Sequence, residues 1–336
     1  MVRATVKIGK QRYAVWLLWI LLAAGAVSGC AVQDGETESP GTRKETGKET
    51  AAGWMLEEAA AAADKLKNYE IRMHLEQSLD HQGAKENVKV DASGTVSRDP
   101  LQMAQTVTSD YDGDVTTIKT ILTPDNYYVN DTLIGVWNRL PKEEIEAVTA
   151  ALSNFQTDPG ALLESMQPYA GGFEAVPTGE GAEGLAVLRL TEEDEGAREL
   201  LGDILTSTLG AGVMEERVRD SIKLNKLVYK VTLDPAAKRL TRLDVVSEMD
   251  MAFEADVRTK VTQTLTVKYD KFDAAGPVEV PEEAKDAPEI MEPGAGIPEL
   301  DDPLADPDAG EPGADAGEPG TDAGGLEPGT DARENG

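Results

Sequence analysis

The chain contains one cysteine, Cys30, and its surroundings define its chemistry more closely than those of any other residue. It directly follows Val27, Ser28 and Gly29, at the point where an apolar N-terminal segment ends. The thiolate of cysteine is a nucleophile that can accept a lipid, and a signal peptidase needs small side chains beside the bond that it cuts. Because there is no second cysteine, the chain cannot form an internal disulfide or a site with several thiolate ligands.

The segment before Cys30 has the composition of a secretory signal. Four basic residues precede an apolar run over residues 14–27, and no acidic residue occurs before Asp34. That run is too short to span a hydrocarbon core comfortably. We therefore predict a bacterial lipoprotein signal over residues 1–29, in which Val27, Ser28 and Gly29 are recognised and Cys30 is lipidated. The alternative is an uncleaved anchor with an incidental cysteine. The basic residues are Arg3, Lys7, Lys10 and Arg12.

Lipidation would determine where the protein is found and how it is held. A diacylated cysteine carries two acyl chains, such as palmitate, and two chains are enough for stable anchoring to a membrane. Residues 30–50 are polar and contain glycine and proline, which predicts a flexible tether with a reach of about 25 Å. The expected location is the extracytoplasmic face of a bacterial membrane, with the membrane contacted through the N-terminal lipid.

The chain is strongly acidic, with a net charge of −30. Such a surface is a poor partner for nucleic acid and for anionic lipid head groups. Much of the acidity lies after Pro281, where residues 311–317, 318–324 and 327–332 are degenerate copies of one another. Proline and glycine in every copy exclude a coiled coil, and the ligand pattern of a calcium loop is missing. Residues 274–336 are therefore predicted to be a disordered acidic tail.

Residues 51–273 are predicted to form one folded domain. Helical spacing of apolar residues over 55–66 is followed by segments in which every second residue is apolar. Strict alternation indicates antiparallel strands with one buried face and one solvated face. These segments lie near residues 69–79, 88–96, 101–111, 116–122, 127–130 and 134–138. Helical patterns over 145–155, 158–166 and 200–209 surround a short strand at 185–190, and three long strands end the domain at 224–233, 243–257 and 261–269.

These patterns predict an α+β fold, in which a large curved antiparallel sheet forms a half-barrel of about ten strands covered by amphipathic helices. Asp112-Gly113 is typical of a hairpin turn, and Asp158-Pro159 is typical of a helix start. The apolar phase slips between Leu224 and Leu227, which predicts a β-bulge.

The chain resembles a family of uncharacterised Gram-positive surface lipoproteins with the fold of the LolA and LppX lipoprotein carriers. The resemblance rests on the helix-to-strand segment at residues 65–69, on residues 99–103 and 127–129, on the segment at 135–141, and on the closing strands at 227–234 and 243–251. It implies binding of acyl chains or lipoproteins between sheet and helices, or, for some relatives, envelope-stress sensing. It transfers no functional residue.

Several apolar residues on the inward strand phase are candidates for lining a ligand cavity. Flexible methionine thioethers line adaptable apolar pockets, but they also fill irregular cores, and an ordinary core under the helices is the alternative. Trp54 and Trp137 are expected to pack in the core or between helix and sheet. The candidate lining residues are Tyr69, Met73, Met103, Tyr111, Tyr229, Met249, Met251 and Phe253.

No residue pattern predicts catalysis, a metal site or a cofactor site. Residues 179–184 match the dinucleotide-binding glycine pattern, but no strand precedes them and no helix follows. His74 and His81 lack the helical spacing of a zinc site and are expected to be surface residues. We therefore expect a non-enzymatic lipoprotein that binds an acyl chain or another apolar ligand. The alternative is a structural or sensing lipoprotein that binds another envelope protein and carries no lipid, and an enzyme with an unrecognised site is a third possibility.

Overall fold

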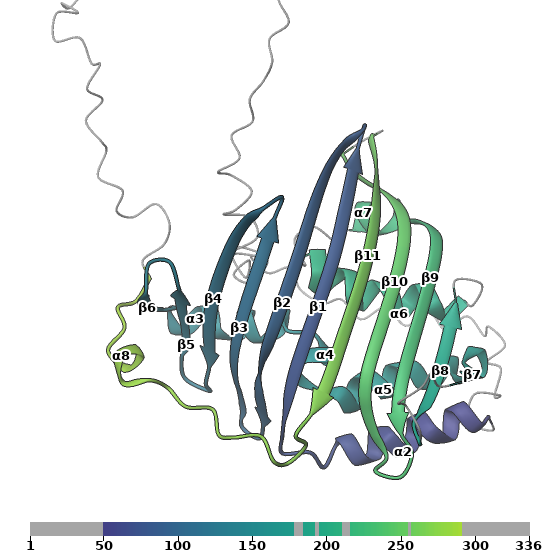
Figure 1. Ribbon diagram of the computed structural model, residues 1–336, viewed down its shortest axis with the longest axis horizontal. Coiled ribbons are helices and arrows are strands. Elements are labelled where there is room, and N and C mark those ends of the chain that lie inside the picture. The colour runs from purple at the N-terminus through teal and green to yellow at the C-terminus, as the bar shows by residue number, and fades with distance from the viewer. Residues whose placement is uncertain (1–49, 178–183, 192–194, 210–215, 255–256, 291–336) are drawn as a thin grey trace, which may run out of the picture. The chain divides into compact units, whose positions relative to one another are not determined.

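The computed structural model describes residues 50–177, 184–191, 195–209, 216–254 and 257–290. The predicted signal segment, Cys30, nearly all of the tether and residues 291–336 lie outside these ranges. The described chain forms an eleven-stranded antiparallel sheet in the order β6-β5-β4-β3-β2-β1-β11-β10-β9-β8-β7 (Figure 1). The first and last long strands, β1 and β11, are paired at its centre. The predicted α+β class with a large curved antiparallel sheet is confirmed.

The strands closely follow the alternating segments of the sequence. On the first half of the sheet they are β1 (Asn68–His81), β2 (Ala84–Arg98), β3 (Leu101–Tyr111), β4 (Asp114–Leu122), β5 (Tyr127–Asp131) and β6 (Val136–Arg139). On the second half they are β7 (Glu174–Val176), β8 (Ala186–Thr191), β9 (Lys223–Asp234), β10 (Arg239–Glu254) and β11 (Val257–Asp270).

Alternation along each strand separates a buried inner face from a solvated outer face. In β11, Val261, Leu265 and Val267 are buried, while Lys260 and Lys268 are exposed. Because neighbouring strands are antiparallel and in register, apolar residues stand beside apolar residues across the sheet. The inner face is therefore continuous over the central strands.

Tight turns fix the register of the two hairpins in the first half of the sheet. Gln82 and Gly83 between β1 and β2 both have positive φ, and so do Asp112 and Gly113 between β3 and β4. Two consecutive residues with positive φ are typical of a type I′ hairpin turn, which the Asp-Gly pair predicted.

Except for α8 (Glu282–Lys285), the helices pack on one face of the sheet, and α3 to α7 lie behind it in the view of Figure 1. Two of them begin where their sequence places a capping side chain. Thr50 accepts a hydrogen bond from the Gly53 amide, and Asp158 accepts one from the Ala161 amide at the predicted helix start. The helices are α2 (Ala51–Ala63), α3 (Lys142–Ala151), α4 (Asn154–Thr157), α5 (Pro159–Met166), the 3-10 turn η1 (Gln167–Gly172), α6 (Glu195–Leu209), α7 (Glu216–Asp220) and α8 (Glu282–Lys285).

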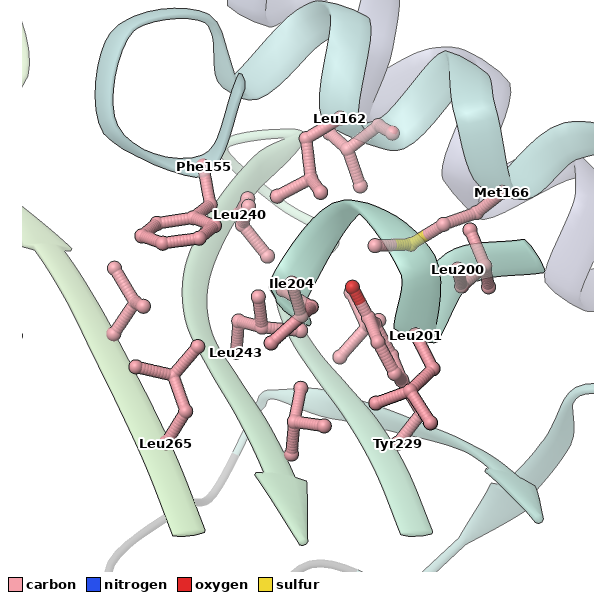
Figure 2. Packing of buried hydrophobic residues seen from close by; sticks show 14 of the residues in the cluster. Phe155, Leu162, Met166, Leu200, Leu201, Ile204, Tyr229, Leu240, Leu243 and Leu265 are labelled. Carbon is pink, nitrogen blue, oxygen red and sulfur yellow. The ribbon is translucent and has the colours of Figure 1, made fainter. Parts of the chain in front are cut away.

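The main core lies between the helices and strands β1 and β8–β11. In Figure 2, Leu201 of α6 lies beside Tyr229 of β9 and Ile204 lies beside Leu243 of β10. Side chains of α4 and α5 also pack into this cluster. The labelled side chains of these two helices are Phe155, Leu162 and Met166.

The predicted bulge occurs in β9. Lys226 pairs with Glu248 and Leu224 pairs with Met249, so Asn225 is the extra residue between them. The bulge shifts the phase by one residue and returns Leu224 to the inner face. Asn225 then points outward and donates a hydrogen bond to Asp250.

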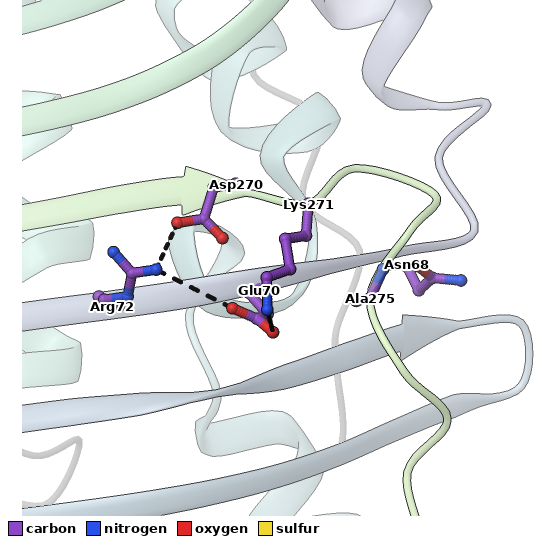
Figure 3. A network of polar contacts seen from close by, with 6 residues as sticks. All are labelled: Asn68, Glu70, Arg72, Asp270, Lys271 and Ala275. Carbon is purple, nitrogen blue, oxygen red and sulfur yellow. Dashed lines mark hydrogen bonds and ion pairs between the residues drawn. The ribbon is translucent and has the colours of Figure 1, made fainter.

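The chain continues in a defined path beyond residue 273, where the sequence predicted that the domain ends. After β11 it runs along one end of the strands to α8 and the edge strand β6 (Figure 1). The Ala275 amide donates to the Asn68 side chain at the base of β1, beside the ion pairs of Arg72 with Asp270 and of Lys271 with Glu70 (Figure 3). We call residues 275–290 the C-terminal strap.

The strap covers apolar residues on the outer face of the sheet. Ala284 and Ala287 are buried against Ile121, Tyr128 and Trp137. The strap also pairs with β6 through two backbone hydrogen bonds. The Arg139 amide donates to the Pro288 carbonyl, and the Ile290 amide donates to the Arg139 carbonyl. Proline and glutamate in the strap resemble those of the following tail, but its small apolar residues give it a surface to pack against. The compact unit accordingly extends to Ile290.

Removing the strap is expected to destabilise the sheet, because Ile121, Tyr128 and Trp137 lose their cover. We expect a chain that ends at Ala274 to lose about 2–4 kcal/mol of unfolding free energy relative to one that ends at Ile290. With residues 1–29 absent and Trp54→Phe in both chains, Trp137 is the sole tryptophan. A red shift of its fluorescence only in the shorter chain would show that the strap covers it, and equal spectra and stabilities would contradict this.

Candidate functional site

A pocket of about 460 Å³ opens between α6, α7 and the start of β9. Its walls combine apolar side chains with an equal number of charged or polar ones. Leu201 and Leu205 come from α6, and Leu224 comes from β9. The remaining lining residues are Glu199, Gly202, Thr206, Arg219, Asp220 and Ile222.

The pocket lies beside the first residues of β9. Strand β8 pairs with Val228–Leu233, and the pocket residue Leu224 precedes this paired stretch. On the other side of the pocket, Gly202 of α6 contributes no side chain to fill the space. A Cβ added at Gly202 would meet no atom within 4 Å. Among the described residues, the absence of a side chain at Gly202 therefore leaves room for the pocket.

The far wall of the pocket is held by hydrogen bonds to the ends of the long strands. Arg217 of α7 donates to the Phe253 carbonyl over 2.8 Å, and the Ser221 hydroxyl accepts from the Ala252 amide over 2.8 Å. Arg258 donates to the Ser221 carbonyl. These contacts attach the turn after α7 to β10 and β11, and so position Arg219 and Ile222 at the pocket.

The eight predicted lining residues are distributed along the inner face instead of surrounding one cavity. Five of them are buried in the core, namely Tyr69, Met103, Tyr229, Met249 and Met251. Met73 and Phe253 are partly buried against it, and Tyr111 is partly exposed near the β3–β4 turn. None of the eight is among the residues that line the pocket beside α6. Met249 comes nearest in register, because it pairs with the lining residue Leu224.

The predicted lining residue Tyr69 and its neighbour Tyr269 have their hydroxyls and rings committed to packing. The Tyr69 hydroxyl donates to the Gln156 carbonyl of α4 over 2.8 Å, and its ring meets the Tyr269 ring edge-on at 5.9 Å. The Tyr269 hydroxyl donates to the Phe155 carbonyl over 2.6 Å. These tyrosines attach α4 to the sheet, which is a structural contribution far from the pocket.

The two tryptophans differ in environment. Trp137 is buried under the strap as expected, but on the outer face of the sheet. Trp54 is 66% exposed, so the prediction that it packs in the core is wrong. The apolar side of α2 is formed by Leu56, Ala59 and Ala60, and Trp54 lies off that side.

The two histidines that were expected to be surface residues contact polar side chains on neighbouring strands. His74 contacts Asp91 at 2.8 Å, and His81 contacts the Thr259 hydroxyl at 3.0 Å. No group of three metal-ligating side chains occurs among the described residues. Residues 179–183 of the glycine pattern lie outside the described residues.

A row of polar residues on the inner face was not predicted from the sequence. Gln77 of β1, Gln263 of β11 and Ser247 of β10 stand side by side in register, and all three are buried. Each interrupts an apolar alternation at the same level of the sheet, as Gln263 does between Val261 and Leu265. We call these residues, with Thr208 of α6, the polar row. Aligning the predicted strands would have placed these three polar residues side by side, and this could have identified the row.

The fold places the protein among α+β proteins in which a large antiparallel sheet carries most of its helices on one face. Residues 52–289 match a family model described as "Family of unknown function (DUF6612)". The chain therefore belongs to this family. No curated protein matches it. Within the described residues, no helix is both long enough and apolar enough to cross a bilayer.

Solved structures with a broadly similar chain path include LprF from Mycobacterium bovis, at 12% identity and a TM-score of 0.37, covering 68% of this chain and 96% of LprF. The MucA/MucB complex of Pseudomonas aeruginosa matches at 12% identity and a TM-score of 0.25, covering 70% of this chain and 62% of that one. A DUF1329 family protein from Desulfovibrio piger matches at 10% identity and a TM-score of 0.21, covering 67% and 94%.

Proposed function

We propose that this protein is a lipid-anchored protein on the extracytoplasmic face of a bacterial, Gram-positive membrane, and that it binds an acyl chain or another apolar ligand between α6 and the sheet. The N-terminal segment ending at Cys30 supports the anchor. The observation that carries the binding proposal is the pocket beside α6, whose leucines continue into the buried core.

The size of the pocket and its apolar side suit a ligand with an apolar part. A volume of about 460 Å³ falls within the range of small-molecule sites, although this pocket is more polar than most such sites. Ile222 and Leu224 are partly exposed and offer an apolar wall, and each methylene buried against it contributes about 0.8 kcal/mol. Arg219 and Glu199 stand at the pocket, where a polar end of the ligand can stay in water.

The alternative is a structural or sensing lipoprotein that binds another envelope protein. Its support is the dense interior, because residues such as Leu188, Leu190 and Leu205 are fully buried and packed together. A packed core with no space for a chain is what this alternative predicts. Binding through the pocket therefore requires α6 or the β9 side chains to move apart as the ligand enters.

Two substitutions at Gly202 test the proposal on the same helix position. Gly202→Trp is expected to fill the pocket and to reduce binding of a neutral apolar fluorophore at least tenfold. Gly202→Ala is the matched control, because it leaves the pocket open and raises helix stability by about 0.5–1 kcal/mol. Fluorescence titration measures both. Equal binding by the two variants would contradict the proposed site, and failure of the unsubstituted protein to bind any apolar probe would favour the protein-binding alternative.

A further inference from the structure

The polar row is unusual because it crosses the middle of an apolar wall. On one side of it the inner face carries Leu75, Leu265, Val245 and Tyr229, and on the other side it carries Leu79, Val261, Met249 and Leu224. Gln263 and Ser247 are both fully buried. Burying polar groups in such surroundings is unfavourable unless hydrogen bonds compensate for the lost water.

The hydrogen bonds within the row leave two polar atoms without partners. Oε1 of Gln263 is contacted by Nε2 of Gln77 at 3.2 Å and by the Thr208 hydroxyl at 3.2 Å. Nε2 of Gln263 and Oγ of Ser247 have no hydrogen-bond partner and are shielded from solvent. The Thr208 hydroxyl also donates to the Ile204 carbonyl over 2.9 Å, so the amide of Gln77 is the donor that holds Oε1 of Gln263 on this side. With the amide in this orientation, the group of Gln263 without a partner is its nitrogen, which can only donate.

The row leads away from the pocket beside α6. Its first neighbour on β9 is Leu227, which pairs with Ser247, and Leu224 of the pocket wall pairs with the next inner residue, Met249. On the helix side, Leu205 lines the pocket and Thr208, one turn further along α6, contacts Gln263. Since neighbouring strands are about 4.8 Å apart, Ser247 lies one strand and Gln263 two strands inward from β9.

The charge of the surroundings restricts what these atoms can bind. The polar row and the two apolar rows beside it contain no lysine or arginine. A carboxylate or phosphate at this depth would be buried without a counter-charge, which is strongly unfavourable. A neutral carbonyl oxygen can accept hydrogen bonds from both unpaired groups at no such cost.

We propose that the polar row binds a neutral carbonyl of the ligand, so that the ligand is an acyl ester or acyl amide. Its carbonyl oxygen accepts hydrogen bonds from Nε2 of Gln263 and Oγ of Ser247. The hydrocarbon chain lies along the leucines between α6 and the sheet. This inference rests on the proposed binding function and identifies the class of ligand.

Carbonyl-labelled methyl tridecanoate and tetradecane provide an ester and a hydrocarbon of similar length for the test. Each displaces a neutral apolar fluorophore from the purified full chain, and the infrared carbonyl band of the bound ester reports hydrogen bonding. We expect the ester to bind about tenfold more tightly than the hydrocarbon, with its carbonyl band shifted to lower frequency. Ser247→Ala with Gln263→Leu is expected to remove both the preference and the shift while hydrocarbon binding persists.

Two further variants keep the test informative. Gln77→Leu with Gln263→Leu removes the amide pair together, so neither glutamine is left without its partner if the first variant folds poorly. Gln105→Leu is the matched control, because Gln105 is also a buried glutamine on the inner face, but it lies on β3. It is expected to leave ester binding unchanged.

The outcomes separate the inference from the proposed function. If the protein binds neither probe, the proposed binding function fails. If it binds ester and hydrocarbon equally and the carbonyl band is unshifted, the polar row holds at most water, and the inference fails while the binding function stands. A shifted band that persists in both row variants would also overturn the inference.

Discussion

Raising the pH from 9 to 11 is expected to lower the free energy of unfolding by about 4 kcal/mol, because three buried tyrosines are held in their protonated form. Tyr69 and Tyr269 lie at one end of the inner face, where their hydroxyls donate to the carbonyls of Gln156 and Phe155. Tyr127 lies on β5, in the same layer of side chains. A phenolate at any of these positions would be buried without water.

The direction of the effect follows from the shifted pKa values. Burial raises the pKa of Tyr69 and of Tyr269 well above the usual value of 10.0, and it raises the pKa of Tyr127 to about 12. In the unfolded chain each tyrosine loses its proton near pH 10. Stability from the protonated folded state is therefore complete below pH 10 and declines as the pH rises toward 12. Each tyrosine contributes about 1.4 kcal/mol per pH unit in that range.

Urea unfolding at pH 8, 9, 10 and 11 measures this dependence. The decline between pH 9 and 11 is expected to become about one third smaller in Tyr69→Phe, and again in Tyr269→Phe, because each substitution removes one titrating group. Each also costs about 1–2 kcal/mol at pH 8, since a buried carbonyl loses its donor. A decline that stays the same size in both variants would show that other groups cause it.

Those tyrosines also show how far the sequence defined the fold. Tyr69 and Tyr269 fall on the apolar phase of clearly alternating segments, so their strands and their inward direction were predictable. Their hydroxyl partners were not, because the carbonyls belong to α4, 87 and 114 residues away in the chain. Alternation defines the face on which a side chain lies, but not which helix covers it.

Neither the polar row nor the strap was predicted, because the composition of each is unlike that of the part of the fold in which it lies. Ser247 and Gln263 fit the inward phase, but their polarity made them look like interruptions of an apolar strand. The strap has the proline and glutamate of a solvated segment, and its few larger apolar residues, Val278, Val280 and Ile290, are separated by charged residues and prolines. In both cases the deciding fact is a long-range contact. Trp54 shows the converse, since a large apolar residue on a helix stays exposed when the packed side of that helix lies elsewhere.

The pocket could not be derived from residue pattern at all. It depends on how α6, α7 and the start of β9 come together and on the absence of a side chain at Gly202. The inward strand phase predicted methionines and aromatic residues as the lining of a cavity, and none of these residues lines the pocket, whose apolar residues are leucines and one isoleucine. The packing of the helices against β9 depends on long-range contacts, which no periodicity describes.

Replacing Cys30 is expected to have the largest effect on the protein in its cell, because the proposed anchor depends on this one thiol. In Cys30→Ser the hydroxyl is a far weaker nucleophile than a thiolate, so no lipid is transferred. Metabolic labelling with an alkyne-bearing palmitate is expected to mark the unsubstituted protein and to leave Cys30→Ser unmarked. The loss should be complete, since the chain has no second cysteine.

Ser28→Ala is the matched control for this experiment, because it changes a neighbouring residue but keeps a small side chain beside the cleaved bond. It should remain labelled and should yield the same mature mass as the unsubstituted protein. That mass should correspond to a chain beginning at Cys30 and carrying two or more acyl chains, which is what stable anchoring requires. Label that persists in Cys30→Ser, or a mature chain beginning elsewhere, would show that residues 1–29 act as an uncleaved anchor or as a different kind of signal. The folded domain and its pocket would then reach the membrane by another route, and the binding proposal would have to be tested without the assumption of a lipid tether.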